Sequence, residues 1–147
     1  MAKTDYSVPF HSSQRAAVCR APFHGTHRNL CYCVDFGVPE GTPVLAARDG
    51  VVVVRESRYA LSYDDPRFMG RANIIVVRHD DGEESVYAHL QWRSVVVRVG
   101  QCVRRGQRIA KSGRTGYAGY PHLHFGVYDA RGRNIPVRFR KPPVRCR

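Results

Sequence analysis

The segment Tyr120-Pro121-His122-Leu123-His124-Phe125 constrains both the fold and the chemistry of this chain, and it follows the glycine-punctuated run Ser112-Gly113-Arg114-Thr115-Gly116. A short segment flanked by aromatic residues predicts a β-strand, in which residues i and i+2 point to the same side. His122 and His124 would then share one side, where one imidazole can bind a metal while the other remains available for proton transfer. The alternative is a half-buried strand whose two histidines share no chemistry.

Short β-branched runs bounded by turn residues recur along the chain and predict an all-β, mostly antiparallel fold. Asp80-Asp81-Gly82 predicts a hairpin turn, and His79 is interpreted as a structural cap of that hairpin. Residues 55–71 lack alternation and predict a long loop of the kind that rims a binding groove. Gln14–Arg20 is the only candidate for a helix. The expected strands are Val51–Val54, Asn73–Arg78, Ser85–Leu90 and Ser94–Val99.

The composition describes one domain with a strongly basic surface. The chain has 147 residues, 43% of them hydrophobic, which argues against disorder. Lys and Arg number 24 against 12 Asp and Glu, for a net charge of +12, and no acidic residue occurs between Glu84 and Asp129. This imbalance, together with the basic residues of Arg131–Arg147, predicts a polyanionic partner, although a solvated surface tuned for solubility is the alternative.

Neither the N-terminal residues nor the cysteines indicate in which cellular compartment the protein is located. Residues 1–20 contain no apolar core of the length that an exported leader needs, and no membrane span is expected. The five cysteines leave at least one unpaired, and Cys31-Tyr32-Cys33 is too closely spaced for an ordinary zinc ribbon.

Candidate metal ligands other than the histidine pair lie earlier in the sequence. Asp35 occurs in an apolar, strand-like context, where a buried carboxylate needs a partner. His27 precedes it by eight residues and could return to the same site through a loop, and the segment Tyr87-Ala88-His89-Leu90 places an imidazole on a separate strand. The HExxH helix of many zinc proteases is absent, so no glutamate is placed as a general base.

At this point the residues resemble the lysostaphin-type (LytM-like) zinc metalloendopeptidases, which cut peptide cross-links in bacterial peptidoglycan. The resemblance covers roughly residues 24 to 128 and implies a compact, mostly antiparallel β-fold, barrel-like with few short helices, and with a groove over the zinc. Its ordered landmarks are Asp35-Phe36, Pro39–Val44, Ala47–Val51, Arg78–Gly82, Tyr87–Leu90, Val99–Val103, Gly113–Gly116 and His122–Phe125.

The resemblance assigns roles to individual residues. Asp35 and His124 correspond to metal ligands of the family, and His89 and His122 to its catalytic histidines that do not bind the metal. The commonest pattern has its first histidine at the position of Cys31, but members with a longer loop carry it earlier, which suits His27; His24 and Cys31 are the alternatives. By strand parity Cys31 would share a face with Asp35, and a thiolate can bind zinc.

We therefore expect one Zn²⁺ per chain, held by His27, Asp35 and His124. A substrate groove is expected at Asn73, Tyr117 and Tyr120. The expected organisation is an N-terminal extension (1–23), a metallopeptidase domain (24–130) and a basic C-terminal tail (131–147).

The expected function is a zinc endopeptidase acting on peptidoglycan cross-links or stem peptides in the cell envelope or outside the cell. Anionic envelope polymers are the expected partners of the basic surface; a monomer is expected, and no specific nucleic acid. The alternatives are a degenerate family member that regulates another wall hydrolase and a basic nucleic-acid-binding β-domain.

Overall fold

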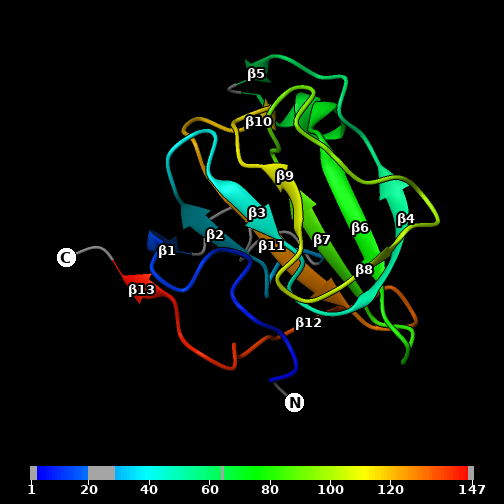
Figure 1. Cartoon of the computed structure of the whole chain (residues 1–147). Helices are drawn as coiled ribbons and strands as arrows, with labels where there is room; N and C mark the ends of the chain where they lie inside the picture. Colours follow the sequence, from blue (N-terminus) through cyan, green and yellow to red (C-terminus); the bar gives the residue numbers. More distant parts are fainter. Residues whose placement is uncertain (1–2, 20–28, 64, 146–147) are drawn as a thin grey trace.

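The computed structural model describes residues 3–19, 29–63 and 65–145, and its main feature is a nine-stranded sheet (Figure 1). The strand order is β13-β1-β2-β11-β7-β6-β4-β8, with β12 paired to β11, and two small sheets, β5–β10 and β3–β9, complete the fold. The strands are β1 (Arg15–Cys19), β2 (Val34–Gly37), β3 (Pro43–Leu45), β4 (Gly50–Arg55), β5 (Ser62–Tyr63), β6 (Ile74–Arg78), β7 (Glu84–Ala88), β8 (Cys102–Val103), β9 (Arg108–Lys111), β10 (Gly116–Tyr117), β11 (Leu123–Tyr128), β12 (Asn134–Ile135) and β13 (Val144–Arg145).

The predicted all-β, mostly antiparallel fold is confirmed. Only the pairings β1–β13 and β5–β10 are parallel among the described strands. The 3₁₀ helix η1 (Pro66–Arg71) is the only helical element in the described part of the chain. None of the helical structure there has the length and hydropathy needed to cross a bilayer.

The core lies on one face of the large sheet because the central strands alternate between two environments. In β6, Ile75 and Val77 are fully buried, and in β11 the same face carries Leu123 and Phe125. The β6–β7 hairpin turns at Asp80-Asp81-Gly82, where Gly82 has a φ of 83° that favours glycine. The predicted hairpin is thus confirmed. His79 is buried beside its turn, and its backbone carbonyl accepts a hydrogen bond from the Gly82 N–H.

One predicted strand and the one candidate helix are not observed. Ser94–Val99 forms no strand, because its backbone groups bind scattered partners: the Val96 N–H donates to Ile109 O, and the Arg55 side chain donates to Val97 O. Gln14–Arg20 contributes strand β1 rather than a helix, since Ala16 is buried in the core beneath the sheet. Residues 55–71 are mostly loop, as predicted, but contain β5 and η1.

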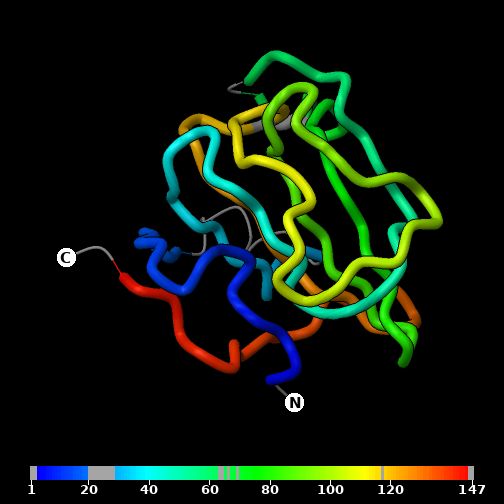
Figure 2. The backbone as a smooth tube through the Cα atoms, viewed as in Figure 1, coloured from blue at the N-terminus to red at the C-terminus, as the bar shows by residue number. Residues whose placement is uncertain are grey.

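The two terminal segments run side by side along one edge of the molecule (Figure 2). The backbone N–H groups of Arg138 and Arg140 donate to the carbonyls of Lys3 and Tyr6, at 2.6 Å and 3.0 Å. The tail ends in β13, at the edge of the sheet, where the Pro142-Pro143 pair does not interrupt a central ladder. Both segments belong to the same sheet as β2–β11; the boundary predicted between residues 23 and 24 lies outside the described residues.

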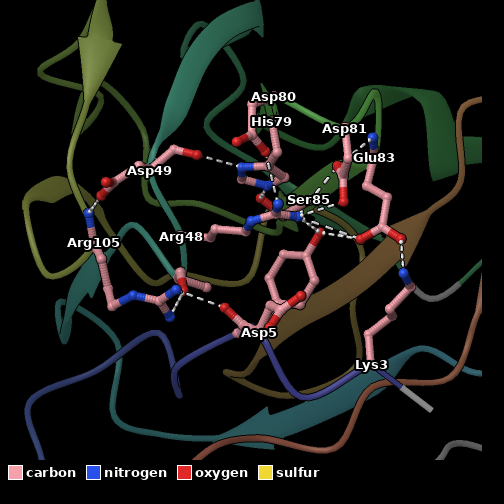
Figure 3. Close-up of polar contacts among 12 residues, drawn as sticks. Lys3, Asp5, Arg48, Asp49, His79, Asp80, Asp81, Glu83, Ser85 and Arg105 are labelled. Carbon is pink, nitrogen blue, oxygen red and sulfur yellow. Dashed lines mark hydrogen bonds and ion pairs between the residues drawn. The ribbon is translucent and has the colours of Figure 1, made fainter.

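A polar cluster centred on the buried Glu83 joins the N-terminal segment to the β6–β7 hairpin (Figure 3). The Arg48 guanidinium lies between the Tyr6 hydroxyl, at 3.3 Å, and the carboxylates of Asp80, Asp81 and Glu83. The Tyr6 hydroxyl donates to Glu83 over 3.0 Å, and Lys3 forms an ion pair with the same carboxylate. Because Glu83 is nearly buried, these partners satisfy a charge that would otherwise be costly to bury.

Candidate metal centre and active site

Asp35 and His124 face each other across neighbouring strands. The register pairs His124 of β11 directly with Asp35 of β2, so both side chains extend from the same face of the sheet. The His124 Nδ1–H donates to Asp35 Oδ1 over 3.1 Å, and both side chains are nearly buried. The apolar strand context of Asp35 therefore does contain a partner for its carboxylate, as the sequence predicted.

Two further imidazoles converge on this pair. His122 precedes β11, and its Nε2 lies 3.7 Å from Asp35 Oδ1. His89 follows β7, and its ring centroid lies 4.6 Å from that of His122 and 5.9 Å from that of His124. The prediction that His122 and His124 point to the same side is confirmed. The register of β7 and β11 brings His89 to the pair, since Ala88 lies opposite His124.

Backbone carbonyls set the orientation of the two flanking imidazoles. The Nδ1 atoms of His89 and His122 lie 2.6 Å from Thr115 O and 2.9 Å from Tyr120 O. A carbonyl can only accept, so each neutral ring carries its proton on Nδ1, and the lone pair is on Nε2. His89 has a left-handed φ of 63°, which costs a non-glycine residue about 1–2 kcal/mol, so its surroundings must hold it there.

The pKa values of the three histidines separate according to their neighbours. Burial, together with the charges of His122 and His124, lowers the pKa of His89 to about 3. Burial also lowers the pKa of His122, although Asp35 opposes this effect. Burial also tends to lower the pKa of His124, but its hydrogen bonds to Asp35 and Cys33 outweigh this effect and raise the pKa to about 9. His89 and His122 are therefore neutral near pH 7, as a proton acceptor must be.

The pair formed by Asp35 and His124 suits a tetrahedral zinc ion. Two ligands at 2.0–2.1 Å from such an ion lie about 3.3 Å apart, close to the 3.1 Å between Oδ1 and Nδ1. A cation could replace the proton that lies between Nδ1 and Oδ1, and both atoms would then bind it. Metals and protons commonly compete for the same ligand atoms in this way. Carboxylate and imidazole are also ligand types that zinc accepts. The residues present thus fit the metal.

The predicted third ligand, His27, falls in a part of the chain that the structure does not describe. His27 and His24 lie outside the described residues, and within the described ranges no three His, Cys, Asp or Glu side chains are grouped to bind a metal. Cys31 lies in a turn and β2 begins only at Val34, so the parity argument that placed Cys31 on the face of Asp35 does not apply. His27 remains the prediction, with His24 and Cys31 as alternatives.

Cys33 is a neighbour of the site that sequence analysis missed. It is fully buried, and its hydrogen bond to His124 contributes to the raised pKa of that histidine. Its Sγ would lie 2.5 Å from a Cβ built on Gly126, so the glycine leaves the space that the thiol occupies. Cys33 directly precedes β2, which begins at Val34, so strand alternation gave no signal for it in the sequence.

The predicted groove residues lie in different environments. Tyr120 is largely exposed, and its ring lies 4.6 Å from that of His122, where it could line a groove. Asn73 is fully buried and bonds only backbone groups and Thr115, a placement that does not favour direct contact with a substrate. The backbone of Tyr117 belongs to β10, but its side chain lies outside the described part of the structure.

The order of these elements along the chain matches a known family. The sequence model of Peptidase family M23 matches residues 30–136, from the turn before β2 to the segment after β12. The chain belongs to peptidase family M23. The resemblance inferred from the sequence is thereby confirmed, and the matched range of this M23 chain contains Asp35, His89, His122 and His124.

Individual relatives of the M23 chain are peptidases of bacteria. It is 40% identical over 104 residues to peptidoglycan DD-endopeptidase ShyB of Vibrio cholerae, covering 70% of this chain and 21% of that protein. A crystallised zinc containing peptidase from Vibrio cholerae is 30% identical with a TM-score of 0.63, over 92% of this chain and 39% of that one. The catalytic domain of the antimicrobial peptidase lysostaphin from Staphylococcus simulans is 36% identical with a TM-score of 0.54, over 66% of this chain and 65% of that one.

The curated relatives are much longer than the matched region. The M23 chain spans only about a fifth to a quarter of the length of the first three, at 21%, 22% and 26%.

Proposed function

We propose that this chain is a zinc-dependent endopeptidase that cleaves peptide cross-links or stem peptides of bacterial peptidoglycan. One observation carries the proposal: Asp35 and His124 form a buried pair suited to a metal, and His89 and His122 flank it as neutral imidazoles. Membership of family M23 and the peptidoglycan endopeptidases among its relatives support the substrate class.

We propose His27, Asp35 and His124 as the ligands of one zinc ion per chain. A bound zinc ion would supply a Lewis acid that polarises the scissile carbonyl and makes water acidic enough to ionise near neutral pH. Two of these three ligands come from adjacent strands of the sheet, which holds their donor atoms in a nearly fixed relation.

His89 and His122 would perform the proton transfers. Each has its Nδ1–H committed to a backbone carbonyl, so each presents the lone pair of Nε2, and Nε2 of His122 lies 3.7 Å from Asp35 Oδ1. One of the two would accept a proton from the attacking water at Nε2, and the imidazolium formed in this way would donate a hydrogen bond to the oxyanion and then its proton to the leaving amine. Burial keeps both imidazoles neutral at the start of the cycle.

We propose that the basic terminal surface binds anionic polymers of the cell envelope, where the enzyme would act. A hollow of about 450 Å³ lies between the N-terminal segment and the tail, and none of the described residues that line it carries a carboxylate. Its polar and cationic lining residues are Ser7, His11, Ser12, Gln14, Arg140 and Lys141. Such a surface attracts phosphate or carboxylate groups at long range.

The decisive experiment is digestion of isolated peptidoglycan with the purified, zinc-loaded chain, followed by analysis of the ends produced. We expect soluble muropeptides with new amine ends and no new reducing sugar ends, and we expect His122→Ala to release none. Reducing ends would mean cleavage of the glycan and would refute the proposed mechanism. Absence of any release from walls of several cross-link types would refute the enzyme assignment.

A further inference from the structure

Asn73 connects three parts of the fold through hydrogen bonds. Its side-chain amide donates to Leu90 O at 3.1 Å and to Tyr59 O at 2.7 Å, while its Oδ1 accepts from the Tyr59 N–H at 2.8 Å. Its backbone N–H donates to Thr115 Oγ1, and its carbonyl accepts from the Leu90 N–H. Every polar group of this fully buried residue therefore has a partner.

Thr115 completes the network on the side of the active site. Its hydroxyl donates to Leu90 O at 2.8 Å while accepting from the Asn73 N–H. Its carbonyl is the acceptor for His89 Nδ1. The carbonyl of Leu90 thus receives two donors, one from Asn73 and one from Thr115, and both groups are shielded from water.

His89 needs support of this kind because its backbone is in the left-handed region, with a φ of 63°. β7 ends at Ala88, so the ladder of that strand no longer holds the chain at His89. The next residue, Leu90, is held at both its N–H and its carbonyl by Asn73, and the ring of His89 is held by Thr115. A rotation of this short segment would move the ring of His89 away from the rings of His122 and His124.

We propose that Asn73 and Thr115 are positioning residues that hold His89 in its catalytic orientation. Asn73 also fixes Tyr59, in the loop that runs from β4 to β5, to the same junction, so the loop and His89 are positioned together. Neither residue touches the metal pair. This inference rests on the proposed function, because it assigns His89 to the catalytic machinery.

The kinetic test replaces each network residue and compares it with a matched control. Asn73→Asp places an acceptor against the carbonyls of Leu90 and Tyr59, and Thr115→Val removes the hydroxyl with little change of shape. Asn134→Asp is the control, since this buried amide likewise bridges two backbone groups, Val127 O and Tyr32 N, at the other end of β11.

We expect kcat on a soluble cross-linked muropeptide to fall about 100-fold in Asn73→Asp and Thr115→Val, with KM changed by less than about threefold and zinc content unchanged. Thr115→Ser retains the hydroxyl and should recover most of kcat. Asn134→Asp should be destabilised to a similar degree but keep kcat. Equal losses of kcat in Asn134→Asp and Asn73→Asp, or no recovery in Thr115→Ser, would overturn the proposal.

A second readout does not depend on activity. In ¹⁵N NMR of the imidazole rings, His89 should show a single tautomer protonated at Nδ1, and this preference should weaken in Asn73→Asp and Thr115→Val but persist in Asn134→Asp. If the wild-type chain cleaved no muropeptide, the proposed function would fail, yet the tautomer would still decide the positioning role. An unchanged His89 signal in both network variants would overturn it.

Discussion

The Nδ1 atom of His124 lies 3.1 Å from Oδ1 of Asp35 because β11 and β2 place the two residues directly opposite each other. This relation makes the proposed metal site depend on the register of the central sheet. A slip of one residue would turn one of the two side chains to the opposite face, which is packed with Phe36, Leu123 and Phe125. The same hydrophobic residues that hold the core together therefore keep the ligand pair aligned.

Removal of His124 and removal of His122 should have different effects. His124→Ala should abolish zinc retention because it removes one of three ligands, and activity should be lost with the metal. His122→Ala should retain about one zinc per chain but lose activity by a factor of about 10²–10⁴, the usual contribution of a general acid or base. Zinc analysis after gel filtration, paired with muropeptide digestion, checks both. Full zinc content in His124→Ala would contradict the ligand assignment.

The third ligand can be identified by three parallel substitutions. His27→Ala should reduce zinc retention to the same extent as His124→Ala, whereas His24→Ala and Cys31→Ser should leave it intact. Each variant is dialysed against a weak chelator, and the remaining metal is measured. Retention of zinc in His27→Ala, with loss in either of the other two variants, would transfer the role to that residue.

Neutralising the basic tail should weaken binding to walls without affecting the active site. Replacing Arg138, Arg140, Lys141, Arg145 and Arg147 with glutamine should lower binding to whole walls at low salt to the level that wild type shows at high salt. The attraction is screened over a Debye length of about 10 Å at 0.1 M salt. The sheet should tolerate the change because Val144 and Arg145 pair with β1 through their backbone; Arg147 lies outside the described residues.

Cleavage of a short soluble muropeptide is the control for the tail variant and should remain at the wild-type rate. An equal loss on walls and on the soluble peptide would mean that the tail shapes the active site. No change on either substrate would mean that the charge of the tail serves only solubility.

Gly50 should tolerate no larger side chain. A Cβ at this position would lie 2.4 Å from Arg78 O and 2.7 Å from a methyl group of Val77, both on the neighbouring strand β6. Gly50→Ala should therefore lower the free energy of unfolding by about 1–3 kcal/mol. Gly70→Ala is the control, since a Cβ there would have no neighbour within 4 Å. Equal urea midpoints for the two variants would contradict the packing at Gly50.

His79 should make stability depend on pH in the mildly acidic range. Burial, assisted by the nearby charge of Arg48, lowers its pKa below the ordinary value of 6.5, despite an opposing hydrogen bond to Asp49 O. Below about pH 6.5 the unfolded chain therefore binds more protons than the folded chain. The contribution of His79 to stability is fully present above about pH 6.5 and is lost as the pH decreases toward the folded-state pKa.

Replacing His79 with glutamine removes this titration. Its unfolding free energy should be lower at pH 8, where the hydrogen bonds to Asp49 O and Ser85 Oγ are perturbed, but should decline less between pH 7 and pH 5 than that of wild type. Urea unfolding at several pH values measures both effects. An identical slope in the two proteins would show that other groups account for the pH dependence.

Several features of the fold could be predicted because their signals are local. Alternating β-branched residues and the Asp80-Asp81-Gly82 turn suffice for the β6–β7 hairpin, since side-chain alternation and turn chemistry depend on neighbouring residues. The same holds for His122 and His124, whose spacing alone places them on one side. Local alternation was insufficient for Ser94–Val99, because a strand also needs a partner that offers a continuous ladder, and here the partners are scattered.

The sequence by itself determined the family and the fold class, and it supplied the side chains that we propose for the site. Only the tertiary structure decided how those side chains meet: that Ala88 and Asp35 both lie opposite His124, that Thr115 O holds the ring of His89, and that the thiol of Cys33 fills the space left by Gly126. The physical reason is that strand register and buried hydrogen bonds join residues far apart in the chain. Their geometry depends on how the whole core packs, and no local pattern of residues encodes it.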